Sequence, residues 1–486
     1  MISVLEEGLF QVETLKGERT SVGLRKLLEQ AHEYSDISGR TPTGRLALLR
    51  LCIAVVGDAY RPGTMSARKS MLEDGAFDKD VLEEYFRVCE QDGPRFLLDD
   101  ERHPFMQAAY RSEADDGAEK PAAALFADLP SGNNHIHLDH RPIEMISVSA
   151  AEALEGMLET YMFCTAAAQG YPSGVNNTNP VYCVIRGETL FETIVLNMVS
   201  CRELGGIPFG EGMVPWRREL DIKPKEQVAF VSYLEALTWQ PRRTTLVFDE
   251  DQRVRRIYMQ QGRNFTGDGR WRDPWVPFRK KRDEEIYVSI KPELGRQLWR
   301  DAGNILSAQS KDSLAPVTVA NAGKVWEDMP NQMLPVQAIG LITNQASFVD
   351  LTQEMLRIPE ALLEDQTRVD RLRHWIAVAE RIHGVTAKII AGDYMQEISK
   401  LVGEGFLRDT RDAIFGELLD QLSEPEPNFT EANRAYAMAI RQTLRDNLGK
   451  ALKQSGTSVK NIKRQNVVEA KTMGYAIKLL KEEGML

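Results

Sequence analysis

The sequence predicts an α+β protein in two domains: a large mixed α/β N-terminal domain, residues 1–350, and a C-terminal four-helix bundle, residues 351–486. Three observations lead to this prediction. A chain of 486 residues is too long for one hydrophobic core. Strand-like and helical segments alternate as far as residue 348, and only helical periodicity follows. A content of 43% hydrophobic and 27% charged residues is ordinary for a folded chain.

The N-terminal domain is expected to mix both kinds of element, joined by loops such as residues 56–70. Strand patterns occur at residues 10–14, 181–185, 246–258 (a hairpin) and 333–342. Helical spacing occurs at residues 22–34, 41–55, 78–91, 149–168, 190–199 and 294–306. In the second of these helices Leu48, Leu51, Cys52 and Val55 recur at the spacing of one face, so we expect that face to be buried.

The C-terminal domain is predicted from four helical patterns. They lie at residues 369–382, 414–422, 435–452 and 467–480. Residues 425–430 read as a linker, with Thr430 as the expected N-cap of the third helix. Four amphipathic helices of this length pack naturally as a bundle.

The net charge of −11 hides two basic regions. Residues 242–282 hold twelve Lys or Arg against five Asp or Glu, and residues 431–486 hold eleven against five. Local field decides where a polyanion binds, so both regions are candidate nucleic-acid surfaces. The first region also interleaves aromatic residues, which suit either base stacking or a core.

The cysteines and the N-terminus indicate a cytoplasmic protein. The five cysteines are scattered and never form Cys-x-x-Cys, which fits a reducing compartment. The first residues carry acids where a signal peptide carries bases, and no apolar run has the length of a membrane span.

The stretch Ser131-Gly-Asn-Asn-His-Ile-His-Leu-Asp-His-Arg-Pro142 is the densest polar segment of the chain. It has two interpretations: a polar loop that binds a partner, or a metal site of a metal-dependent hydrolase built on His135, His137 and Asp139. In an extended segment these three share one face while His140 points away, and no hydrolase motif supports them.

Five blocks, in this order and at these separations, resemble one family. They are Arg95-Phe-Leu-Leu with His103-Pro-Phe-Met-Gln107, Ser131-Gly-Asn-Asn with Asp139-His140, the turn-rich run before Val184-Ile-Arg-Gly187, Trp239-Gln-Pro241, and Asn344-Gln-Ala-Ser347. The chain resembles CasA, the large-subunit family of the type I-E CRISPR Cascade complex, over nearly its whole length.

This resemblance implies a non-enzymatic subunit without a cofactor. The expected partners are double-stranded target DNA, the guide CRISPR RNA, the other Cascade subunits (backbone, small and guide-end) and a helicase-nuclease. The family recognises the protospacer-adjacent motif (PAM) from the minor groove, helps to start strand separation, holds the displaced strand and helps to recruit the nuclease. Guide pairing reads the target sequence itself.

The resemblance also implies site residues. The wedge that enters beside the first base pair matches Asn344, Gln345 and Ala346. The minor-groove loop matches Gly170, Tyr171, Ser173 and Gly174, although Pro172-Ser173 replaces an expected glycine run. The loop at the guide-RNA end and its neighbouring subunits matches Asn133, Asn134, His135, Leu138 and His140.

Two further sites follow from the resemblance and the charge pattern. The family's lysine finger is expected in the hairpin around Gln260–Arg263, where this chain has no lysine and offers Gln260, Gln261 and Arg263. Asp249-Glu-Asp-Gln252 stands where some relatives have a cysteine cluster, so we expect no zinc. The displaced strand is expected to lie along the basic patch Lys460, Lys463 and Arg464.

Overall fold

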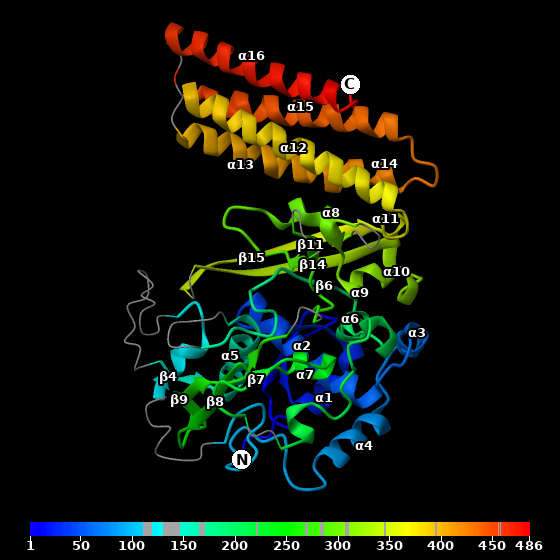
Figure 1. The fold of residues 1–486 in the computed structure, drawn as a ribbon, viewed down its shortest axis with the longest axis vertical. Coiled ribbons are helices and arrows are strands. Elements are labelled where there is room, and N and C mark those ends of the chain that lie inside the picture. Colours follow the sequence, from blue (N-terminus) through cyan, green and yellow to red (C-terminus); the bar gives the residue numbers. More distant parts are fainter. Residues whose placement is uncertain are drawn as a thin grey trace. The chain divides into compact units, whose positions relative to one another are not determined.

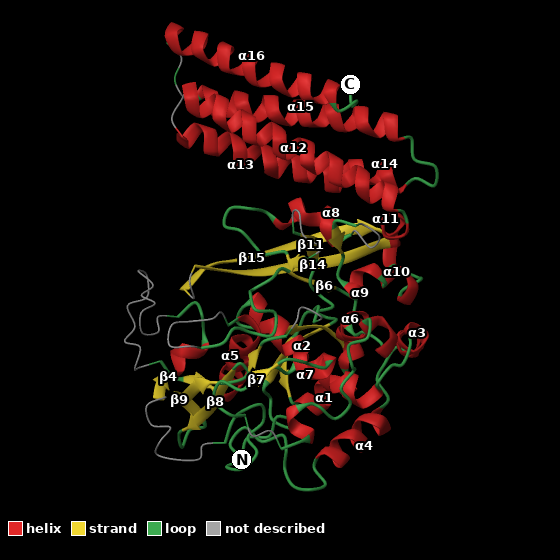
Figure 2. Ribbon diagram, in the orientation of Figure 1, coloured by secondary structure: helices red, strands yellow, loops and turns green. Residues whose placement is uncertain are grey.

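The computed structural model describes most of the chain, and its elements are drawn in Figures 1 and 2. The described residues are 1–109, 119–129, 146–164, 171–219, 222–267, 271–281, 286–306, 311–344, 347–393, 396–454, 456 and 458–486. They form a mixture of helices and strands that ends in a helical region, which confirms the α+β prediction.

The chain folds into two compact units that are not contiguous in sequence. The first unit comprises Met1–Leu298, Ala315–Glu327 and Pro335–Met355. The second comprises Trp299–Leu314, Asp328–Leu334 and Leu356–Leu486. The second unit therefore takes in short segments that lie before residue 350, in addition to the C-terminal helices.

The first unit contains one long helix, α2, against which α4, α5, α6 and α7 pack. The unit contains α1 (Leu24–Glu29), α2 (Pro42–Tyr60), α3 (Met65–Asp74), α4 (Lys79–Cys89), α5 (Ala150–Phe163), α6 (Leu190–Asn197), α7 (Tyr233–Leu237), α9 (Val317–Ala320) and α10 (Ala322–Val325). Short 3₁₀ turns occur at Ala31–Glu33, Ala122–Leu125, Cys201–Leu204 and Pro215–Arg217.

The first unit also contains several small sheets. Strands β1 (Phe10–Thr14), β2 (Arg19–Val22) and β3 (Tyr34–Ser38) form one sheet in the order β2-β1-β3. Strand β9 (Arg253–Gln261) pairs with β4 (Glu119–Pro121), β5 (Val148–Ser149) and β8 (Arg242–Phe248). Two shorter pairs join β7 (Gln227–Val228) to β10 (Asn264–Phe265), and β11 (Phe278–Lys280) to β12 (Tyr287–Ser289). A further three-stranded sheet contains β6 (Tyr182–Ile185), β14 (Met333–Asn344) and β15 (Ser347–Pro359), in the spatial order β15-β14-β6.

Helix α2 is buried on every side, which corrects the prediction of a single buried face. Almost all of its residues from Thr43 to Asp58 are inaccessible to solvent, because α4, α5, α6 and α7 pack around it. A helix that is apolar all round belongs in a core. The helix starts at the N-cap Thr41, whose hydroxyl accepts a hydrogen bond from the Gly44 N–H at 2.9 Å, and Pro42 occupies the first turn.

Several predicted elements before residue 360 are confirmed, and three further expectations are wrong. The strand at 10–14 and the helices near 78–91, 149–163 and 190–197 are present. Residues 56–70 contain the end of α2 and the start of α3 rather than a loop. The helix expected at 294–306 shrinks to a 3₁₀ turn, Leu298–Asp301, and α8 (Ala302–Ile305), because Gly295 adopts a left-handed φ of 74°.

The third wrong expectation is that strands end at residue 348. Strand β15 runs to Pro359, and its side chains are mostly exposed or half-buried. One edge of its backbone pairs with β14, and local periodicity does not reveal this pairing.

The second unit contains the four predicted helical segments. They are α12 (Gln366–Asp393), α13 (Gln396–Ala413) running through a π-turn at Ile414–Leu418 into α14 (Leu419–Ser423), α15 (Phe429–Lys453) and α16 (Val459–Glu482). The unit also holds α8, α11 (Glu360–Glu364), β13 (Ser313–Leu314) and a 3₁₀ turn at Pro330–Gln332. The N-cap of α15 is Asn428 rather than Thr430, since the Asn428 side chain accepts from the Glu431 N–H at 3.2 Å.

Aromatic stacking and one arginine hold this bundle together. The rings of Trp375 and Tyr436 stack 5.2 Å apart, and the Tyr436 hydroxyl donates to the Trp375 carbonyl at 2.6 Å. Arg368 donates to the carbonyls of Leu422 and Glu424 at 2.6 and 2.8 Å, which satisfies the last turn of α14.

Two glutamates of α5 accept hydrogen bonds from residues at the N-terminus of α2. Glu155 accepts from the Arg40 N–H at 2.6 Å, and Glu159 accepts from the hydroxyls of Thr41 and Thr43. Both side chains are buried, and they lie one turn apart on the same helix face. Burial, with a smaller contribution from the Glu159 charge, raises the pKa of Glu155 to about 7.

We predict that Glu155 makes folding less favourable as pH rises. Its pKa is raised above that of the unfolded chain, so the folded state binds the extra proton and stability declines between about pH 4.5 and pH 7. Glu155→Gln keeps an acceptor oxygen without the charge. The stability of the variant relative to the parent is expected to rise by up to about 3 kcal/mol between about pH 5 and pH 8.

The measurement is the midpoint of urea unfolding across this pH range. Glu83→Gln on the exposed side of α4 is the matched control and is expected to leave the pH profile unchanged. Parallel profiles for Glu155→Gln and the parent chain would show that the Glu155 carboxyl does not titrate in this window.

Candidate nucleic-acid interface

Strands β14 and β15 are exposed where they flank residues 345–346. Strand β6 pairs with Val336–Ile339 of β14, so residues 340–344 continue beyond this pairing. Asn344 is exposed, as are Ser347 and Val349 at the start of β15. Of the predicted wedge, Asn344 thus lies at the surface, while Gln345 and Ala346 lie outside the described residues.

The base of this hairpin is fixed by a charged cluster. Gln337 of β14 accepts a hydrogen bond from the Arg45 guanidinium, which also donates to Asp36 at 2.6 Å. Arg186 pairs with the same Asp36 carboxylate at 2.6 Å. Burial lowers the pKa of Arg45 and the Arg186 charge adds to this effect, while Asp36 opposes it. Asn344 therefore lies at the end of a strand that is tied to α2, β3 and β6.

The predicted minor-groove loop is packed against protein where the structure describes it. Ser173 and Gly174 are buried, and a Cβ on Gly174 would lie 3.0 Å from the Met162 carbonyl oxygen. The Tyr171 hydroxyl donates to the Met259 carbonyl at 3.1 Å, so this side chain is fixed on strand β9. The backbone of Ser173 and Gly174 thus contacts protein in this conformation, and Gly170 lies outside the described residues.

The β8–β9 hairpin confirms the predicted hairpin and separates its arginines into two kinds. Arg263, one of the predicted finger residues, is 6% exposed, pairs with Glu235 at 2.7 Å and stacks on Trp239 at 4.5 Å. Its guanidinium therefore faces the interior. Gln260 and Gln261 are half-buried, and Gln260 accepts a hydrogen bond from Arg243.

The exposed cations of this hairpin were not singled out by sequence reasoning. Arg255 and Arg256 have side chains that are 57% and 62% exposed, and their carboxylate partners lie at 3.3 and 3.4 Å. Such exposed pairs are weak and open to exchange with a phosphate. Strict strand alternation would place Arg256 on the same buried face as Val254, so the sequence pattern does not reveal this pair of exposed arginines. The register of β8 and β9 shifts opposite Val247 and Phe248 and leaves Arg255 outside the pairing.

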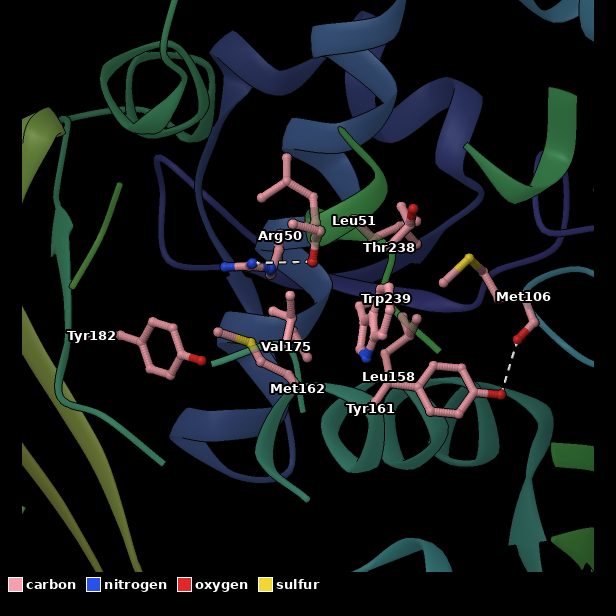
Figure 3. A pocket seen from close by; sticks show the side chains of 13 residues that line it. Arg50, Leu51, Met106, Leu158, Tyr161, Met162, Val175, Tyr182, Thr238 and Trp239 are labelled. Carbon is pink, nitrogen blue, oxygen red and sulfur yellow. Dashed lines mark hydrogen bonds between the residues drawn. The ribbon is translucent and has the colours of Figure 1, made fainter. Parts of the chain in front are cut away.

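The aromatic residues of the basic region form core rather than a stacking surface. Trp275 is fully buried, and Phe265 and Trp271 are 7% and 8% exposed. Trp239 is buried beside a cavity of about 30 Å³ that Arg50 and Tyr161 also line (Figure 3). Each indole is large enough to fill the space between small sheets, which is the commoner use of aromatic side chains in strands.

The predicted basic patch lies on the first part of α16. Lys460, Lys463 and Arg464 are all exposed, with Val459 and Ile462 exposed beside them. The helix begins at the N-cap Ser458, which accepts from the Asn461 N–H at 3.2 Å.

The His-rich stretch lies outside the part of the chain that the structure describes. Asn133, Asn134, His135, Leu138 and His140 lie outside the described residues, as do His137 and Asp139 of the alternative metal site. Among the residues that are described, no group of three or more His, Cys, Asp or Glu side chains is arranged to hold a metal ion. In the same residues, no helix combines the length and apolar character needed to cross a membrane.

Comparison with known proteins identifies the family. The chain is an α+β protein with a C-terminal helical region, and it carries exposed cations on β9 and on α16. The family model described as CRISPR-associated protein Cse1 matches residues 9–447. The chain belongs to the CRISPR-associated protein Cse1 family. None of the curated proteins compared with the chain matches it.

Solved structures share the whole fold. The crystal structure of Cse1 from Acidimicrobium ferrooxidans is 20% identical, covers 99% of this chain and 98% of that chain, and has a TM-score of 0.81. The structure of Thermus thermophilus CasA (Cse1) is 20% identical, with 98% and 100% covered and a TM-score of 0.75. A chain of a CRISPR RNA-guided surveillance complex is 16% identical, with 98% and 99% covered and a TM-score of 0.71.

We predict that the two kinds of arginine in the hairpin differ in their effect on stability. Arg263→Ala leaves the buried Glu235 carboxylate with Arg218 as its remaining partner, and we expect a loss of about 2–3 kcal/mol. Arg255→Ala removes an exposed pair and is expected to cost less than about 0.5 kcal/mol. Urea unfolding of both variants measures the difference, and equal losses would contradict the inward role of Arg263.

Proposed function

We propose that this chain is the non-catalytic large subunit of a type I-E CRISPR Cascade complex. The family match over residues 9–447 carries this proposal. The similarity of fold to a chain of a CRISPR RNA-guided surveillance complex supports it. The expected setting is the cytoplasm, and no cofactor is required.

In this role the chain recognises the PAM in duplex DNA, helps to start strand separation and holds the displaced strand. It contacts the guide RNA and the backbone, small and guide-end subunits, and helps to recruit the helicase-nuclease. Sequence recognition of the target is left to guide pairing, so the protein needs shape and charge complementarity more than base readout.

The hairpin of β14 and β15 supports the wedge. A wedge must resist the duplex that it enters, and groups on firmly held elements keep their geometry best. Asn344 is exposed at the end of a strand that is otherwise largely buried and whose base is bound by Arg45. Gln345 follows directly in sequence and brings a side chain that both donates and accepts hydrogen bonds.

The exposed cations support backbone contacts. Arg255 and Arg256 on β9 and Lys460, Lys463 and Arg464 on α16 are accessible on their respective units. Of the glycine-loop residues that the structure describes, Tyr171 is half-buried, with Lys120 4.7 Å from its ring, whereas Ser173 and Gly174 are buried. We propose that these accessible side chains contact the phosphates, whereas Arg263 stabilises the fold through Glu235 and Trp239.

The wedge is tested by Gln345→Ala in the assembled complex. We expect slower opening of duplex target by about tenfold, the effect of one or two lost hydrogen bonds, and unchanged binding of a target that is already melted. Strand opening is followed by a fluorescent base beside the PAM. Val349→Ala, on the exposed start of β15, is the control. Equal losses on duplex and melted targets would remove the wedge role.

The basic patch is tested through the salt dependence of binding. Reversing the charge of Lys460, Lys463 and Arg464 is expected to weaken DNA binding and to flatten the plot of log affinity against log salt by about 0.7 per lost single-strand phosphate contact. Lys478→Glu changes the charge on the other half of the same helix, where Lys478 is already paired with Glu482. An unchanged slope in the triple variant would place α16 away from the DNA.

A further inference from the structure

A polar groove lies in the first unit, and it does not include any of the predicted site residues. Its volume is about 550 Å³. Residues between Arg95 and Ala109 form one wall, and residues between Pro215 and Glu219 form the other. Gln240 also lines the groove. The first wall is the block Arg95-Phe-Leu-Leu to Gln107, which helped to reveal the family resemblance and to which no role has been given.

The first wall is held rigidly from beneath. The Met106 carbonyl accepts from the Tyr161 hydroxyl at 3.0 Å and from Gln240 Nε2 at 2.7 Å (Figure 3 shows the first of these). These two bonds keep Met106 at a left-handed φ of 57°, which is uncommon for a residue other than glycine. Gln107 adds bonds to the Leu98 carbonyl and the Leu246 N–H.

The second wall is anchored just as firmly. Trp216 is buried, and its indole N–H donates to the Tyr85 hydroxyl at 2.7 Å. Tyr85 in turn donates to Asp58 of α2 at 2.9 Å. Arg218 donates to Glu235 at 2.9 Å, and the rings of Phe105 and Trp216 stack 5.5 Å apart between the walls. Because both walls are fixed, the groove is formed before any ligand arrives, which reduces the entropic cost of binding.

The rim of the groove offers positive charge that the fold does not use. Within the described residues neither Arg95 nor Arg102 takes part in an ion pair, although both line the groove. Of the two acids, Glu219 lies 3.6 Å from His103 Nε2, and Glu101 is exposed. The guanidinium Nε of Arg218 is buried without a hydrogen-bond partner in this part of the chain.

We propose that this groove binds a phosphate group, carried either by a free nucleotide or by the phosphorylated end of a single nucleic-acid strand. The fork of N–H donors on a guanidinium matches the oxygens of a phosphate. The volume is that of a site for a small ligand, and the lining is mostly polar and charged, which suits a phosphate and sugar better than an apolar peptide. The proposal is independent of the role in a Cascade complex, since it concerns the isolated chain.

Isothermal titration calorimetry of the full chain tests the proposal with pyrophosphate, AMP and adenosine. We expect pyrophosphate and AMP to bind and adenosine to give no saturable heat. Arg95→Ala and Arg102→Ala are each expected to weaken binding by about tenfold or more, as for the loss of a charge-assisted hydrogen bond. Arg102→Glu is expected to weaken it further with an unchanged melting temperature, because Arg102 is exposed.

Arg87→Ala is the matched control, since Arg87 is an exposed arginine paired with Glu84 on α4. A short single strand with a 5′-phosphate, compared with the same strand ending in a hydroxyl, separates the two sources of phosphate. Preference for the phosphorylated strand, displaced by pyrophosphate, indicates a strand end; binding of AMP without that preference indicates a free nucleotide.

Three outcomes would overturn the proposal. They are an absence of saturable heat with both pyrophosphate and AMP at millimolar concentration, equal affinity for AMP and adenosine, and unchanged affinity in both arginine variants. In the first of these cases, binding of a glutamate-rich peptide that is weakened by both Arg95→Ala and Arg102→Ala would assign the groove to an acidic protein segment instead.

Discussion

The first unit depends on the complete burial of α2 together with its charged residues. Arg50 and Asp58 lie on this helix without access to water, so each requires a partner that compensates the cost of desolvation. Asp273 pairs with Arg50 at 2.9 Å, and the Trp275 ring lies 5.1 Å from the same guanidinium. Asp58 accepts from the Gly212 N–H at 2.8 Å and from Tyr85. Segments far apart in sequence are thereby fixed against one helix.

This constraint reaches the surfaces to which we assign function. The Trp216–Tyr85–Asp58 chain of hydrogen bonds fixes one wall of the polar groove. Arg45, on the same helix, is bound to Gln337 at the base of the β14–β15 hairpin. A helix that cannot move without exposing charges is a suitable support for the proposed wedge and for the proposed ligand groove. The ion pairs and hydrogen bonds that offset the desolvation cost of the buried charges also hold these segments rigidly.

The arginines of this acidic chain divide between two tasks. Arg50, Arg68 and Arg263 are buried with carboxylate partners, and they join elements of the first unit. Arg255 and Arg256 are exposed, and because their ion pairs are also exposed and weak, they remain available to an external anion. A count of basic residues in the region 242–282 treats both groups alike, so only burial shows how much of its charge reaches solvent.

The sequence by itself determined the class of fold, the four C-terminal helices, the β8–β9 hairpin and the family, because these depend on local periodicity and on ordered blocks of residues. It also identified Asn344 as a surface residue of interest and α16 as basic. Only the tertiary structure decided that α2 is buried all round, that β15 is a strand, that Arg263 and Gly174 face protein, and that Arg95 and Arg102 line a groove. The physical reason is that burial, strand pairing and ion pairing are set by partners distant in sequence, which a local pattern does not contain.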